Sequence, residues 1–101
     1  MAKLRHIALS VPDPEKAADF YCEAFDMERV GKTDSPLARG CYVSDGTITM
    51  ALLAYKSDEW SGYVEGEDER GKDWQGIHHM GFWVDDINET EKKIEAAGGK
   101  Y

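Results

Sequence analysis

The strongest constraint on this sequence is an internal repeat, in which a short apolar run with a histidine near its start leads into a helix signal. Four pairs of identical residues share one offset of 73 positions: His6 and His79, Val11 and Val84, Asp13 and Asp86, Ala24 and Ala97. A duplicated strand–helix unit can place two equivalent histidines around one pseudo-symmetry axis. Such a pair suits a metal ion, because imidazole is a common metal ligand.

Both apolar runs alternate as half-buried strands do. The apolar side carries Ile7, Leu9 and Val11 in the first run and Met80, Phe82 and Val84 in the second. His6 and His79 fall on the opposite side, so we expect both imidazoles to point away from the helices into the hollow of a curved sheet. The same alternation puts His78 on the helix side, and we assign it no functional role.

The remaining signals complete one unit and begin another. Asp13 and Asp86 predict helix N-caps, followed by helices that end near residues 26 and 97. Asp45-Gly46 predicts a hairpin between strands at 40–44 and 47–55, and residues 27–33 can form a short strand. Residues 56–75 are acidic, contain three glycines and show no clear period, which indicates a linker.

These elements predict an α+β fold and one domain over residues 1–101. A βαβββ module spans 1–55, a linker spans 56–76, and an incomplete βα module spans 77–101. We expect a curved mixed sheet with helices on its convex face. A half-built second module leaves an open strand edge, so we also expect a homodimer.

Composition excludes several classes of function. The hydrophobic fraction of 42% is that of a folded chain, and the net charge of −8 argues against nucleic-acid binding. No apolar run of about 18 residues is present, so we expect no membrane span. Cys22 and Cys41 show no motif spacing, which indicates reduced thiols in a cytoplasmic protein.

Among chemical motifs, only the histidine pair stands out. Imidazole suits zinc, iron, nickel and copper, so His6 and His79 are candidate metal ligands. The segment from Gly66 to Asp73 nearly matches a phosphate-binding loop, but its acidic residues would repel phosphate and we reject it. No nucleophile constellation is evident, and the catalytic residues stay unassigned.

The segments 4–21 and 76–86, which contain the two histidines and the two helix caps, resemble the vicinal oxygen chelate superfamily. This group is also called the glyoxalase/bleomycin resistance/dioxygenase fold. The resemblance implies paired βαβββ modules, each giving a histidine from its first strand and a carboxylate from its last. Together these residues would hold a divalent ion (Zn, Ni, Fe or Mn) that chelates vicinal oxygens of a small molecule.

The sequence departs from that pattern at two positions. Met50 stands where the resemblance places the first carboxylate, and the second would lie beyond Tyr101. One hypothesis is therefore a metal-dependent, lactoylglutathione lyase-like enzyme, whether lyase, isomerase or dioxygenase. A second is a metal-free, drug-sequestering protein that binds a small molecule through Met50 and Trp83. A third is a truncated product without activity of its own.

Overall fold

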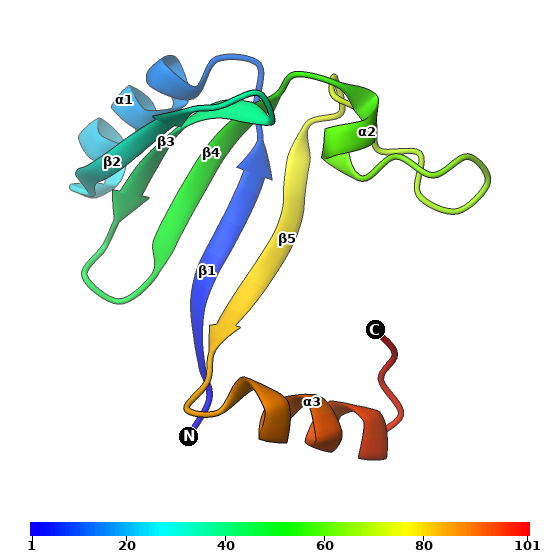
Figure 1. The fold of residues 1–101 in the computed structure, drawn as a ribbon. Helices are drawn as coiled ribbons and strands as arrows, with labels where there is room; N and C mark the ends of the chain where they lie inside the picture. Colours follow the sequence, from blue (N-terminus) through cyan, green and yellow to red (C-terminus); the bar gives the residue numbers. More distant parts are fainter.

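Five strands form one curved mixed sheet in the order β2-β3-β4-β1-β5 (Figure 1). The computed structural model describes residues 1–101. Its elements are β1 (Lys3–Ser10), α1 (Pro14–Phe25), β2 (Glu28–Asp34), β3 (Ala38–Ser44), β4 (Thr49–Tyr55), α2 (Asp58–Ser61), β5 (Gly76–Trp83) and α3 (Ile87–Ala96). The expected α+β class, a βαβββ module followed by a βα unit, is confirmed.

Strand β1 is an interior strand of the sheet and joins the two units. It runs parallel to β4 on one side and antiparallel to β5 on the other. Ile7 lies beside Met50 and Leu9 beside Leu52 in the β1–β4 register. Because neighbours in register share a face of the sheet, these four side chains point to the same side.

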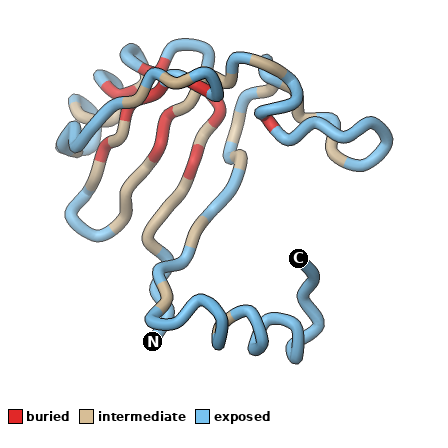
Figure 2. Tube along the Cα trace, in the orientation of Figure 1, coloured by how far each residue is buried: buried red, intermediate tan, exposed pale blue.

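Helix α1 covers that side of the first unit. The Asp13 side chain caps it by accepting the Lys16 backbone N–H at 3.2 Å, and Pro14 occupies the first turn. The helix ends at Asp26, whose φ of 56° lies in the left-handed region. The buried core lies between α1 and the sheet and consists of Ala18, Cys41, Val43 and Leu52. Figure 2 shows the buried positions gathered mainly in α1, β1, β3 and β4.

Helix α3 forms as expected but does not lie against the sheet. The Asp86 side chain caps it by accepting the Glu89 backbone N–H at 3.0 Å. None of its residues is buried, and Ile87 and Ile94 are 74% and 51% exposed. Figure 1 shows the helix beyond the ends of β1 and β5. We expected helices on the convex face of the sheet, and α3 differs from α1 because α1 packs on β3 and β4 whereas α3 makes no comparable contact with any strand.

The linker between the units contains one short helix. Ser57 caps α2 by accepting the Trp60 backbone N–H at 3.2 Å, and Gly62 ends the helix with a φ of 90°. The following residues return to the sheet through a turn closed by a bridge between Val64 and Asp68. None of the three helices has the length and apolar character needed to span a bilayer.

Candidate functional site

The two repeat histidines lie on neighbouring strands, the interior strand β1 and the edge strand β5. His6 of β1 is in register with Thr49 of β4 and with Gly81 of β5, and His79 of β5 is in register with Ala8. Since Leu9 packs under α1, the alternation of β1 directs His6 to the opposite face. We call this the histidine face.

The imidazoles meet through their outer nitrogens. The two Nε2 atoms are 3.2 Å apart, and the ring centroids are 5.2 Å apart with the planes inclined at 30°. Zinc–nitrogen bonds of about 2.0–2.1 Å in tetrahedral geometry would separate two ligand nitrogens by about 3.3 Å. The observed pair therefore fits two adjacent coordination positions of one divalent ion.

A β-bulge brings a third histidine to the same place. The β1–β5 register shifts between Ala8 and Leu9, and His78 is the extra residue of β5 at that point. A bulge lets two consecutive side chains point to one side of a strand. The Nδ1 atoms of His78 and His79 are 3.0 Å apart, so the interpretation that His78 lies on the helix side is wrong.

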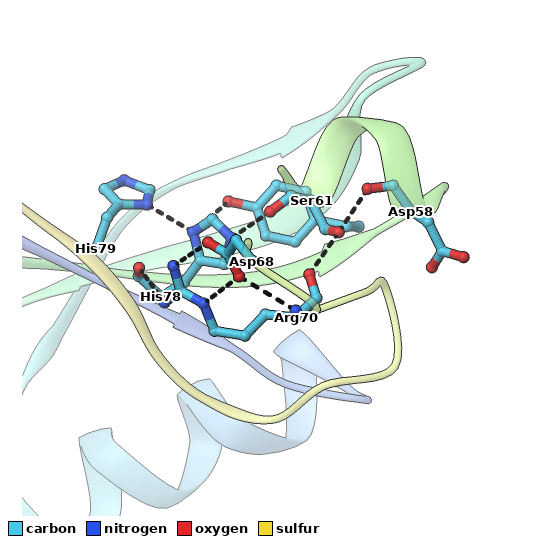
Figure 3. A network of polar contacts seen from close by, with 7 residues as sticks. Asp58, Ser61, Asp68, Arg70, His78 and His79 are labelled. Carbon is cyan, nitrogen blue, oxygen red and sulfur yellow. Dashed lines mark hydrogen bonds and ion pairs between the residues drawn. The ribbon is translucent and has the colours of Figure 1, made fainter. Parts of the chain in front are cut away.

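His78 connects the histidine pair to the linker (Figure 3). Its Nε2 lies 2.5 Å from the backbone carbonyl oxygen of Ser61, which is 1% exposed. Its Nδ1 lies 3.4 Å from the Tyr55 hydroxyl, and the two rings are 4.9 Å apart. The three histidines therefore form a continuous chain of polar contacts from β1 to the buried end of α2.

Burial and neighbouring charges lower the pKa of His79 and so favour its neutral form. Partial burial lowers the pKa of the His79 imidazole below its ordinary value of 6.5. Neighbouring groups that can carry positive charge lower the pKa further: His6, His78 and Arg70. A neutral imidazole has a free nitrogen lone pair, and this is the form that binds a metal ion.

Strand β4 contributes no acidic side chain beside the pair. Its residues on the histidine face include Thr49, Ala51 and Leu53, in register with the same face of β1. No group of three or more His, Cys, Asp or Glu side chains is arranged to hold a metal ion. The donors fit a metal as two imidazole ligands, with the other positions left to water and substrate oxygens.

The structure does not bring Met50 to the histidines. Met50 lies on the opposite face, beside Ile7, and packs against the core under α1. It lines a pocket there with aromatic residues of α1, among them Tyr21 and Phe25. Trp83 ends β5 beside Lys3 and is 70% exposed. It shares the parity of His79 along the strand, with Gly81 between them.

The family model of the Glyoxalase/Bleomycin resistance protein/Dioxygenase superfamily matches residues 3–101. The chain belongs to this superfamily. A probable lactoylglutathione lyase of Synechocystis sp. is 30% identical over 101 residues, which is 96% of this chain and 71% of that protein. A probable chloroplastic lactoylglutathione lyase of Arabidopsis thaliana is 28% identical over 97% of this chain and 27% of its own length.

Solved structures of the glyoxalase superfamily share the fold. A hypothetical protein from Bacillus halodurans superposes with a TM-score of 0.73 at 23% identity, over 96% of this chain and 69% of that one. Methylmalonyl-CoA epimerase from Mycobacterium tuberculosis superposes with a TM-score of 0.70 at 16% identity, over 94% of this chain and 63% of that one. At these identities the likeness concerns the fold alone.

Sequence reasoning missed His78, Tyr55 and Ser61 as neighbours of the histidine pair. The adjacent His78-His79 dipeptide was the available signal, because two polar residues in succession interrupt the alternation of a half-buried strand. Nothing comparable marked Ser61, which lies 17 positions before His78 in the linker.

Proposed function

We propose that this protein is a metal-dependent enzyme of the glyoxalase type, similar to lactoylglutathione lyases. His6 and His79 would hold a divalent ion such as Zn, Ni, Fe or Mn. The ion would chelate vicinal oxygens of a small substrate. The observation that carries the proposal is the 3.2 Å separation of the two Nε2 atoms at equivalent positions of the repeat.

In such a reaction the ion would supply the chemistry, and the chain's own residues would hold the ion in place. The bound ion would act as a Lewis acid that stabilises an enediolate-type oxyanion. His6 and His79 would orient it by presenting neutral nitrogens from two neighbouring strands. The small side chains of Ala8 and Ala51 lie side by side on the histidine face and present no polar atom of their own. Because Thr49 is not a base at neutral pH, β4 supplies no proton acceptor beside the pair.

A titration of the metal-free protein tests this proposal. Isothermal calorimetry with Zn²⁺, Ni²⁺, Fe²⁺ and Mn²⁺ should give one site per chain, and His6→Ala and His79→Ala should each abolish it. Arg5→Ala is the control, since the side chain of this half-buried neighbour donates a hydrogen bond to the Thr47 carbonyl, at 3.0 Å, and none to either histidine. The loaded protein should then catalyse the formation or cleavage of lactoylglutathione. Absence of stoichiometric binding by the unmodified protein would contradict the proposal.

A second candidate is a metal-free small-molecule binding protein. The specific observation that favours it is the absence of a carboxylate beside the histidines on β4, where the next two residues on the same face, Ala51 and Leu53, are apolar. In that case a small apolar ligand would bind the protein equally well with and without a chelator. His6→Ala would then leave ligand affinity unchanged, whereas a metal enzyme would lose it.

We also propose that the chain forms a homodimer. Strand β5 pairs only with β1, so its other edge offers unsatisfied backbone groups to a further strand. Three large apolar side chains of β5 are 58–61% exposed: Ile77, Met80 and Phe82. Such a combination is typical of an association surface. Light scattering coupled to gel filtration should give twice the chain mass, and a monomer at micromolar concentration would contradict the proposal.

A further inference from the structure

We infer that His78 is a positioning residue that sets the ring tautomer of His79 and thereby presents the His79 Nε2 lone pair toward His6. The purpose of this arrangement rests on the proposed metal-dependent function, but the tautomer itself is a property of the metal-free protein. The groups involved are the side chains of His78 and His79 and the backbone carbonyl of Ser61.

The assignment follows from which atoms can donate. The Ser61 carbonyl oxygen can only accept, so the His78 nitrogen at 2.5 Å from it, Nε2, must carry the hydrogen. In a neutral imidazole the other nitrogen, Nδ1, is then an acceptor. His79 Nδ1 lies 3.0 Å from that acceptor, so it must be the donor of this hydrogen bond. His79 Nε2 is consequently left with a bare lone pair, 3.2 Å from His6 Nε2.

The linker holds His78 from two directions (Figure 3). On the side-chain end, the Ser61 hydroxyl lies 2.7 Å from the Asp58 carbonyl oxygen and 3.0 Å from the Arg70 carbonyl oxygen, and its single hydrogen is shared between these two acceptors. On the backbone end, Arg70 Nη1 donates to the His78 carbonyl at 3.0 Å. Asp68 in turn fixes the Arg70 guanidinium through an ion pair of 2.6 Å. The orientation of His78 is thus determined by the segment between the two modules.

One other group competes for the acceptor. The Tyr55 hydroxyl lies 3.4 Å from His78 Nδ1, compared with 3.0 Å for His79 Nδ1. A single nitrogen lone pair accepts one hydrogen bond well, and the shorter contact has the better geometry. Tyr55→Phe should therefore leave the His79 tautomer unchanged, which makes this variant a suitable control.

Two substitutions separate positioning from a merely structural role of His78. In His78→Asn the amide oxygen takes the approximate place of Nδ1, so an acceptor for His79 is kept while the contact with Ser61 is lost. In His78→Gln the amide nitrogen takes the approximate place of Nε2, so the tie to Ser61 is kept while the acceptor is lost. Positioning predicts that Asn preserves the tautomer and that Gln does not, and a structural tie predicts that Gln is the better replacement.

The measurement is long-range proton–nitrogen NMR of the metal-free protein at a pH where all histidines are neutral. The unmodified chain should show hydrogen on Nε2 of His78 and on Nδ1 of His79. His78→Gln should shift His79 to a mixture of tautomers and raise the dissociation constant for Zn²⁺ about 10–100-fold, the range typical of groups that orient metal-binding histidines. His78→Asn should stay close to the unmodified protein in both respects.

Three results decide the matter. Hydrogen on Nε2 of His79 in the unmodified protein would overturn the inference, and so would an unchanged tautomer in His78→Gln. If the tautomers are as assigned and respond to His78→Gln, but no metal binds, positioning by His78 stands and the proposed metal-dependent function fails. The two proposals therefore fail on different measurements.

Discussion

Replacing Gly81 with alanine should weaken metal binding without unfolding the protein. A Cβ atom added at this position of β5 would lie 3.2 Å from the Cβ of His6 and 3.6 Å from its Cγ and Cδ2 atoms. Ordinary contacts begin at about 3.4 Å, so the His6 side chain must retreat by a few tenths of an ångström. Metal–ligand distances in proteins hold to within about 0.2 Å. Displacement of this size should therefore cost about tenfold in metal affinity, or about 1.4 kcal/mol.

The folded chain should tolerate the same change. Tight packing of the new methyl group costs about 1 kcal/mol, at the low end for overpacked sites. Removing a glycine from a strand interior stabilises the fold by about 0.5–1 kcal/mol. Because these two contributions nearly cancel, the free energy of unfolding of the metal-free protein should change by less than about 1 kcal/mol.

The assay is a Zn²⁺ titration by calorimetry together with urea unfolding of the metal-free protein. Gly31→Ala in β2 is the matched control, because a Cβ there would meet only the Tyr42 ring at an ordinary 3.4 Å. The control should keep the metal affinity of the unmodified chain. Equal Zn²⁺ affinity in both variants would refute the argument that Gly81 makes room for the His6 ring.

Three further predictions concern the scaffold. Leu52 is fully buried, so Leu52→Ala should lower the free energy of unfolding by about 2–5 kcal/mol in urea, and an equal loss in half-buried Leu53→Ala would contradict this. The Arg70 guanidinium lowers the pKa of Asp68 from its ordinary 3.8 to about 2. The pair therefore stabilises the fold fully above pH 3.8 and ceases to do so as the pH falls to about 2. In Asp68→Asn the urea midpoint should vary less with pH over that window, and a pH dependence equal to that of the unmodified chain would count against the pair. Asp13→Ala removes the cap of α1 and should cost about 1 kcal/mol in thermal unfolding followed by circular dichroism, whereas no loss would mean that water replaces the cap.

The repeat in the sequence was sufficient to place the histidine pair. His6 and His79 occur at equivalent positions of two alternating runs, and alternation alone determines which face of a strand a side chain occupies. Pairing of β1 with β5 then brings the two rings together. Local signals also predicted both long helices, since Asp13 and Asp86 each act as N-caps.

The residues that surround the histidine pair could not be placed from the alternation of apolar and polar residues alone. His78 reaches the histidine face only because β5 contains a bulge, and a bulge depends on pairing with β1 rather than on β5 itself. The resemblance placed the first carboxylate position at Met50, whereas Thr49 is the β4 residue in register with His6. An error of one residue in the register of a strand moves every side chain to the other face of the sheet. Such an error hardly affects the predicted fold, but it changes which residues are assigned to the site.

The position of α3 was not predictable from its own amphipathic pattern. A helix buries its apolar side only where a surface is present to receive it, and α1 finds that surface on β3 and β4. Ile87 and Ile94 have the spacing of an inward-facing stripe, yet both stay exposed. The pattern therefore predicted the helix itself but not its position relative to the sheet.

The position of β5 at the rim of the sheet has a consequence for exchange with solvent. His6 belongs to an interior strand, hydrogen-bonded on both edges, whereas His79 belongs to a strand bonded on one edge only. Strands of the second kind detach at lower free energy than the whole molecule unfolds, and their amide hydrogens exchange sooner. Any ion or molecule that bridges the two imidazoles must also hold the edge strand β5 against β1. Its binding energy should therefore appear as slower amide exchange along the whole of residues 76–83, and not only at His79.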